Sequence, residues 1–197
     1  MPDTTMTQAE IVDALKAADA VLDGHFVLTS GRHSDTYVQC ARILEDPALT
    51  TRLAQAAVAG LPEDLDIDLV AAPAVGGLVI GFAVAQALGV KFIFTERENG
   101  RMVFRRAFKV PEGARVLVVE DVVTTGGSVA EVIALVEAAG ARVVGVVSLI
   151  DRGGDKAFSS PAWPLLRLEV ESWDPASCAL CASGVEVYSP GSRRLAT

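Results

Sequence analysis

The sequence predicts an α/β fold in which a parallel sheet carries helices on both faces. Segments with strand and helix patterns alternate between residues 67 and 150. Two of the strands, 115–119 and 142–150, are apolar and rich in valine, as expected of strands buried on both faces. Hydrophobic residues make up 51% of the chain, which excludes a disordered protein, and the length predicts a single domain over residues 1–197.

Two helices before residue 60 have clear start signals. Thr7 and Glu10 form a capping box ahead of apolar residues at helical spacing, which predicts the first helix. Gly24 ends that region, and residues 25–40 are expected to form two short extended runs. A second helix is expected from Asp46 to about residue 59, because an aspartate in the N-cap position precedes a proline in the first helical position.

The remaining elements follow the strand–helix alternation. Strands are expected at 67–72, 91–95, 115–119 and 142–150, and helices at 77–88 and 128–139. Beyond residue 161 the pattern weakens into short runs and a tail rich in proline, serine and glycine. No internal repeat or interdomain linker interrupts the chain.

Residues 69–90 form an uncharged run of 22 residues, which is long enough to span a bilayer. However, Pro73, Gly76 and Gly77 punctuate the run, Gln86 interrupts it, and no basic cluster flanks it closely. We expect a buried strand, a glycine turn and a buried helix here, and no membrane span.

The charge of the chain limits its partners. Lysine and arginine number 17 against 25 acidic residues, so the net charge is −8. A general nucleic-acid binder usually carries a basic surface, so we expect no nucleic-acid partner. No secretory signal is visible, and three cysteines are too few for a disulfide framework. We therefore expect a cytoplasmic protein with reduced thiols.

The cysteines and histidines offer an incomplete metal site. Cys178 and Cys181 form a Cys-x-x-Cys pair, which is half of a zinc site, and no second pair exists. Structural thiols are the favoured interpretation, with zinc or redox chemistry as alternatives. Cys40 could add a third ligand only by folding close to the pair. His25 and His33 are the only histidines, and we expect a surface or substrate-edge role for them.

Residues 116–128 carry the sharpest signal. A buried strand ends in the two acids Glu120 and Asp121, a loop of small and hydroxyl residues follows, and then a helix begins. A glycine-rich loop at a helix N-terminus presents free N–H groups to a phosphate. Carboxylates beside it accept hydrogen bonds from hydroxyl groups. A ligand with a phosphate and neighbouring hydroxyls is a phosphorylated sugar. The loop is not a Walker A motif, because no G-K-[ST] occurs in the chain.

This segment resembles the phosphoribosyl-diphosphate (PRPP) motif of the type I phosphoribosyltransferases. In that family the two acids hold the 2- and 3-hydroxyls of ribose, and the loop cradles the 5-phosphate. The alternative is a strand–turn–helix junction with threonine caps and a solvated acid pair. The resemblance implies that PRPP is bound by Glu120, Asp121, Val122, Val123, Thr124, Thr125, Gly126, Gly127 and Ser128.

Residues 24–37 resemble the N-terminal hood of the orotate phosphoribosyltransferases, F-x-L-x-S-G-x-x-S-x-x-[FY]. Orotate is a flat anion, which needs an aromatic face and hydrogen-bond donors. Asp151-Arg152, at the end of the next strand, matches an Asp-Arg pair whose arginine binds the orotate carboxylate in that family. The resemblance implies a hood formed mainly by residues 1–45 and an orotate site that includes Thr124, Arg152, Tyr37 and Ser30.

A basic cluster lies between residues 97 and 109, where five of the 17 basic residues occur. The family places a flexible loop here that reaches diphosphate, often across a dimer interface. This chain departs from the usual R-K-x-x-K-x-H-G loop, because its segment is short and offers Arg97 and Arg101 instead. Thr29 and Gly76 also stand where lysine is common. The resemblance therefore implies a ribose-phosphate site but does not assign the residues that contact diphosphate.

The resemblance implies an enzyme that transfers the 5-phosphoribosyl group from PRPP to orotate, giving orotidine 5-monophosphate and diphosphate in pyrimidine biosynthesis. It implies Mg²⁺, bound mainly through PRPP rather than by protein ligands, and a homodimer. Two alternatives use the same fold. One is a non-catalytic sensor of PRPP or nucleotides, and the other is a purine phosphoribosyltransferase.

Overall fold

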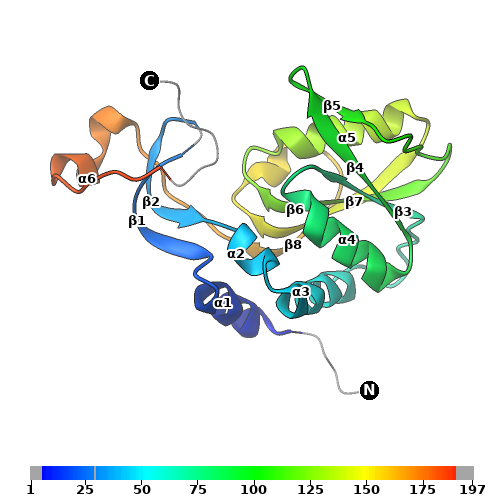
Figure 1. Ribbon diagram of the computed structural model, residues 1–197, viewed down its shortest axis with the longest axis horizontal. Coiled ribbons are helices and arrows are strands. Elements are labelled where there is room, and N and C mark those ends of the chain that lie inside the picture. The colour runs from blue at the N-terminus through cyan, green and yellow to red at the C-terminus, as the bar shows by residue number, and fades with distance from the viewer. Residues whose placement is uncertain (1–5, 29, 190–197) are drawn as a thin grey trace.

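A six-stranded sheet in the order β5-β4-β3-β6-β7-β8 forms the centre of the molecule (Figure 1). The computed structural model describes residues 6–28 and 30–189. All neighbouring strands pair in parallel except β4 and β5, which form an antiparallel hairpin. The predicted α/β class is confirmed. The strands are β3 (Leu69–Pro73), β4 (Lys91–Glu98), β5 (Arg101–Phe104), β6 (Arg115–Val123), β7 (Arg142–Asp151) and β8 (Ala162–Arg167).

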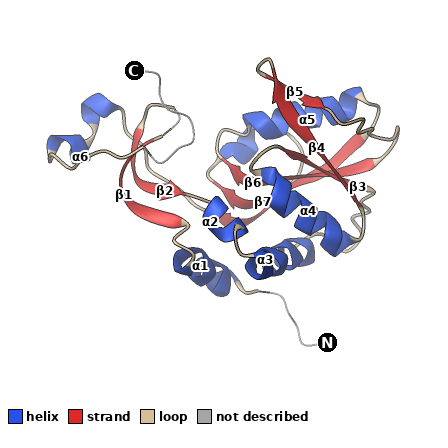
Figure 2. Ribbon diagram, in the orientation of Figure 1, coloured by secondary structure: helices blue, strands red, loops and turns tan. Residues whose placement is uncertain are grey.

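Helices cover both faces of this sheet, with α5 on one face and α1, α3 and α4 on the other (Figure 2). Successive residues of a strand point to opposite faces. Val116 and Val118 of β6 therefore join the core beneath α5, whereas Leu117 and Val119 join the core on the other face. The helices are α1 (Gln8–Ala17), α2 (Ala41–Leu44), α3 (Pro47–Ala59), α4 (Gly77–Leu88) and α5 (Gly127–Ala138).

A separate two-stranded hairpin stands at one end of the molecule, next to the short helix α6 (Ala179–Ala182) (Figure 1). It consists of β1 (Val21–Val27) and β2 (His33–Val38), paired antiparallel. The C-terminal region flanks both strands, because Trp173 exchanges backbone hydrogen bonds with His33, and Tyr188 bonds to β1. The expected hood therefore exists, but it also contains the C-terminal segment that the sequence pattern left unassigned.

The start signals of two helices are confirmed. Thr7 and Glu10 form the capping box of α1, and Asp46 caps α3 by accepting the backbone N–H groups of its first turn. Gly89 ends α4 in the left-handed conformation, at φ 71°. Within the described residues, none of the helices has the length and hydropathy needed to cross a bilayer.

Several expected boundaries are wrong. Gly24 lies inside β1 and does not end the N-terminal region. β6 extends four residues beyond position 119, so the acid pair belongs to the strand itself. The region after residue 161 contains β8, an edge strand that tolerates Pro164, because an edge position leaves one side without a partner strand.

Candidate active site at the carboxyl ends of β3, β6 and β7

The strands that follow β3 in the chain are added to the sheet on one side of it, and those from β6 onward are added on its other side. β4 lies beyond β3, whereas β7 and β8 lie beyond β6, so the carboxyl ends of β3 and β6 border a topological switch point. Ligands of open α/β sheets bind at such a point. The loop after β3 closes on the acid pair here, since a Cβ on Gly76 would lie 2.5 Å from the Asp121 carboxylate. A lysine at position 76 would therefore displace Asp121.

The two acids differ in their surroundings. Glu120 is buried, and this burial, with Asp121 beside it, raises its pKa well above the ordinary value. Asp121 is partly exposed, and its Oδ1 accepts the backbone N–H of Val122 at 2.7 Å. It borders a hollow of about 310 Å³ that is also lined by Gly76 and Gln39. Asp121 is thus the acid of this pair whose side chain is accessible to a ligand.

Glu120→Gln should make the free protein more stable at neutral pH. The unfolded chain ionises this carboxyl near its ordinary pKa, but the folded chain keeps the proton to higher pH. The free energy of unfolding therefore falls as the pH rises between the two pKa values. The amide of Glu120→Gln is neutral at every pH, so the variant should not show this decrease. The decrease in the free energy of unfolding is about 1.4 kcal/mol for each pH unit in that interval.

Urea unfolding at about pH 5 and about pH 8 would measure this difference. Glu112→Gln, which changes an exposed carboxyl, is the matched control. An identical pH dependence in native protein and Glu120→Gln would contradict the buried, proton-holding state of Glu120.

The loop between β6 and α5 has the form of a phosphate cradle. Thr124, Thr125 and Gly127 are exposed, and no side chain caps the N-terminus of α5, so its first N–H groups face outward. Gly126 has φ 71°, and a Cβ there would collide with the Gly154 carbonyl of the loop after β7. The loop therefore requires glycine at position 126 both for its backbone angle and for this close packing.

Arg152 directly follows β7 beside this cradle, and its side chain carries a donor that has no hydrogen-bond partner among the described residues. Its backbone N–H bonds to the Val123 carbonyl at 2.8 Å, which ties it to the end of β6. Its side-chain Nε is buried and has no hydrogen-bond partner among the described residues. Burial lowers the pKa of this guanidinium, while Tyr37 acts in the opposite direction. A buried cationic donor without a partner is suited to an anionic ligand.

The residue before it, Asp151, has a different role. It is buried and accepts the backbone N–H groups of Gly153 and Gly154, each at 2.9 Å, and the Arg167 guanidinium at 2.7 Å. Its acceptor capacity is therefore committed to shaping the loop after β7. That loop positions Arg152 on one side and packs on Gly126 on the other.

The hood contributes a group of aromatic rings, of which Tyr37 is close enough to Arg152 to act on its pKa. The rings of Phe26 and Tyr37 lie 5.6 Å apart between centroids, and Tyr188 meets Phe26 edge-on at 6.4 Å. Tyr188 is not predicted from the sequence, because nothing in its local pattern marks it. Ser30 is exposed at the hood's turn, and the neighbouring Thr29 lies outside the described residues.

The basic cluster is largely paired in the structure. Arg97 binds Glu131 of α5 at 2.9 Å, and Arg106 binds Glu96 at 3.0 Å. Arg105 lies 3.5 Å from Glu98. Arg101, at the start of β5, and Lys109 are exposed and have no carboxylate partner among the residues that the structure describes. The cluster is thus a weaker source of free positive charge than its sequence suggests, and Arg101 and Lys109 are its two unpaired members.

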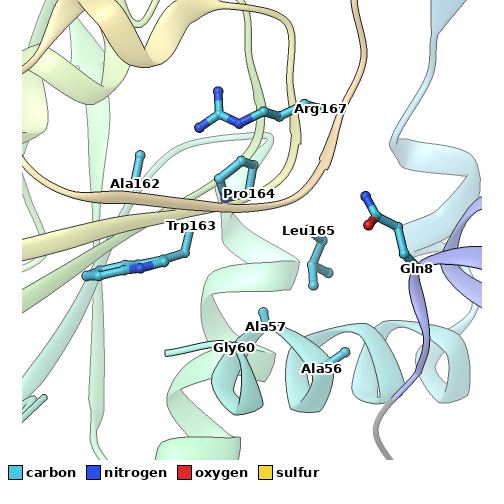
Figure 3. A pocket seen from close by; sticks show the side chains of 9 residues that line it. All are labelled: Gln8, Ala56, Ala57, Gly60, Ala162, Trp163, Pro164, Leu165 and Arg167. Carbon is cyan, nitrogen blue, oxygen red and sulfur yellow. The ribbon is translucent and has the colours of Figure 1, made fainter. Parts of the chain in front are cut away.

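A second hollow, of about 360 Å³, lies between α3 and β8 (Figure 3). Ala57 and Leu165 are among its mainly apolar lining residues, and Trp163 lies along one side. Its one cation, Arg167, is held by Asp151 and Asp155. None of the residues of the predicted PRPP or orotate sites lines this hollow, so we do not place the chemistry here.

The expected surface position of the histidines is wrong, since His25 and His33 are buried next to Cys178 and Cys181. A role at the edge of the substrate site stays a prediction. Cys40 does not join them. Its thiol instead lies 4.0 Å from the Asp121 carbonyl, where burial raises its pKa well above the ordinary value. None of the three cysteines forms a disulfide in the structure.

Comparison with known proteins defines the class first. The family model of the phosphoribosyl transferase domain matches residues 41–176, which include the acid pair, the phosphate cradle and Arg152. A crystal structure of orotate phosphoribosyltransferase from Aeropyrum pernix superposes with a TM-score of 0.71 at 28% identity, and the match covers 81% of this chain and 94% of that chain.

Curated relatives narrow the class. The chain is 48% identical to orotate phosphoribosyltransferase of Chlorobium phaeobacteroides over 98% of its own length and 100% of that protein. It is also 48% identical to the enzyme of the same name from Heliobacterium modesticaldum, over 95% of this chain and 100% of that protein. The chain belongs to the orotate phosphoribosyltransferase family.

Proposed function

We propose that this chain transfers the 5-phosphoribosyl group from PRPP to N1 of orotate, releasing diphosphate and forming orotidine 5-monophosphate for pyrimidine synthesis. The observation that carries the choice of base is the buried, unpaired Nε of Arg152 beside the phosphate cradle. The named relatives above favour this activity over a purine enzyme or a non-catalytic sensor. Free thiols are in keeping with a cytoplasmic location.

The reaction depends on positioning the two substrates and on stabilising the charge that develops, and it requires no covalent nucleophile. Residues 124–128 would hold the 5-phosphate, and Asp121 with Glu120 would accept hydrogen bonds from the ribose hydroxyls. Arg152 would hold the orotate carboxylate while the hood aromatics cover the ring, which aims N1 at the ribose carbon. As the bond to diphosphate breaks, the ribose would gain positive character, and the Asp121 carboxylate would stabilise that charge.

Magnesium fits this site by its donor chemistry. Mg²⁺ prefers oxygen ligands and is often held by substrate phosphates with one or two carboxylates. Asp121 offers carboxylate oxygens at the hollow, so it would assist while PRPP supplies most ligands. When bound, the ion would neutralise part of the diphosphate charge.

A direct assay tests the proposal. Purified protein with PRPP and orotate should show loss of orotate absorbance, and the rate should depend on Mg²⁺. Uracil, which lacks the carboxylate, should be a poor substrate. Faster turnover of uracil or adenine than of orotate, or no turnover of any base, would overturn the assignment.

We propose that the chain acts as a homodimer. α4 and the loop before it expose large apolar side chains, with Val75 80%, Val79 47% and Phe82 60% exposed. An apolar patch of this kind is typical of an interaction surface. The patch adjoins the hollow at Asp121, since Val75 and Val79 also line that hollow. A second subunit seated on the patch would lie close to the diphosphate end of PRPP.

Arg101→Ala should lower kcat by about tenfold, because the exposed side chain would lose a charge-assisted contact to diphosphate of about 1.5 kcal/mol. Lys91→Ala, which removes an exposed cation at the other end of β4, is the control and should leave kcat unchanged. Steady-state rates at saturating PRPP measure both. Native turnover in Arg101→Ala would show that diphosphate is handled elsewhere.

Mixing two impaired variants tests whether Arg101 acts across the interface. When Arg101→Ala and Arg152→Ala subunits exchange, a mixed dimer has one complete site if the arginine comes from the neighbour. Activity should then exceed the sum of the separate variants. No gain after demonstrated subunit exchange would place Arg101 in its own subunit's site or outside it.

A further inference from the structure

Four side chains with metal-binding atoms meet between the hood and the C-terminal segment. His25 lies on β1 and His33 on β2, whereas Cys178 and Cys181 lie at the start of α6 and within it. Their potential ligand atoms all lie within 4.8 Å of one another. The histidines are separated from the cysteines by more than 140 positions, so the fold has brought two distant segments to one point.

The distances fit the edges of a tetrahedral site. Zn–N bonds of about 2.0–2.1 Å and Zn–S bonds of about 2.3 Å give N···S edges of about 3.5 Å in a tetrahedron. The Nε2 atom of His25 lies 3.4 Å from Cys178 Sγ and 3.7 Å from Cys181 Sγ, and Cys181 Sγ lies 3.2 Å from His33 Nδ1. The two ring nitrogens are closer, at 2.9 Å, and need to move apart by about half an ångström around an ion.

A hydrogen bond outside the cluster orients the first ligand. His25 Nδ1 lies 2.8 Å from the Val185 carbonyl, which can only accept, so this nitrogen carries the proton. The lone pair of Nε2 then points into the cluster. A backbone carbonyl in this position is the usual second contact of a histidine that binds a metal through its other nitrogen.

More groups approach the Nε2 atom of His25 than one hydrogen bond can pair. Three groups, His33 Nδ1 and the sulfurs of Cys178 and Cys181, all approach the single Nε2 lone pair of His25. That lone pair can accept one hydrogen. His25, His33 and Cys178 are buried, so within the cluster water can reach only the exposed Cys181. A cation at the centre would satisfy all four at once.

We propose that one Zn²⁺ ion is bound by four side chains: His25, His33, Cys178 and Cys181. Thiolate and imidazole ligands in a tetrahedral set select zinc among common divalent ions. All four positions are filled by protein, which defines a structural site, not a catalytic one. The proposal does not depend on the reaction proposed above.

Such an ion would fasten the C-terminal segment to the hood. A two-stranded hairpin alone is marginally stable in water. The backbone bonds of Trp173 to β2 and of Tyr188 to β1 flank the cluster on the C-terminal segment, so the ion would lock contacts that already exist. The hood aromatics around Phe26 would then be held over the base site.

Metal analysis of the full chain tests the site. The protein should be produced without a histidine tag in zinc-supplemented medium and purified under reducing conditions. We expect one zinc ion per chain by mass spectrometry of the metal content. After replacement with Co²⁺, we expect a thiolate-to-cobalt charge-transfer band and the strong visible bands of tetrahedral cobalt.

The variant Cys178→Ser with Cys181→Ser should lose the zinc and the cobalt spectrum. Cys40→Ala removes the one cysteine outside the cluster and should keep both. The cobalt spectrum of the native chain decides the matter if the double variant does not fold. A native chain with neither zinc nor a cobalt–thiolate band, or with a Cys178–Cys181 disulfide, would overturn the proposal. Zinc retained by a folded double variant would overturn it as well.

Discussion

Arg152→Ala should raise the KM for orotate by about 10- to 150-fold, because a hydrogen bond to a charged group contributes about 1.5–3 kcal/mol. The KM for PRPP should change little, since the phosphate cradle and the acid pair remain. Arg152→Lys should recover part of the loss, because lysine keeps the charge without the planar fork of donors. Initial rates with each substrate varied in turn measure these effects.

Arg142→Ala provides the matched control. It removes an exposed arginine from the opposite end of the same strand, far from the base site, and should leave both KM values unchanged. An Arg152→Ala protein that uses orotate as well as the native chain, or that loses PRPP instead, would remove Arg152 from the orotate site.

Asp121→Asn should weaken PRPP binding by about 10- to 150-fold, for the same loss of a charge-assisted hydrogen bond. The amide keeps the shape that Gly76 accommodates, so the fold should be retained. Titration calorimetry with PRPP in the presence of Mg²⁺ measures the affinity. Ribose 5-phosphate should bind more weakly too, because it carries the same hydroxyl groups.

Asp64→Asn is the control for this change. Asp64 is exposed and precedes β3, so it lies near the amino ends of the parallel strands, whereas Asp121 lies near their carboxyl ends. If Asp121→Asn unfolds at the same temperature as the native protein and binds PRPP with the same affinity, the acid pair does not belong to the ribose site.

The elements that the sequence predicts well are those with local signals. The Thr7–Glu10 box and the Asp46 cap act within one helical turn, so nearby residues suffice to place them. β6 and β7 are predicted because a strand buried on both faces is apolar throughout. The ribose-phosphate site that we propose is also marked by local sequence, since its residues form the junction of one strand and one helix.

Features that depend on distant partners were missed. β5 and β8 are edge strands, whose short or proline-containing sequences carry a weak pattern. The pairing of Arg97 with Glu131 joins residues 34 positions apart, so the cluster read as free positive charge. The four-residue His/Cys cluster could be suspected only by adding two hood histidines to the Cys-x-x-Cys pair, a combination that spacing alone does not favour.

A crystal structure of the protein with orotidine 5-monophosphate tests the central claim most directly. The orotate carboxylate should lie about 2.7–3.2 Å from the Arg152 guanidinium, and the phosphate should accept N–H groups of residues 124–128 at similar distances. The ribose hydroxyls should face Asp121. A nucleotide whose phosphate or base binds elsewhere, such as the hollow beside Trp163, would contradict the site described above.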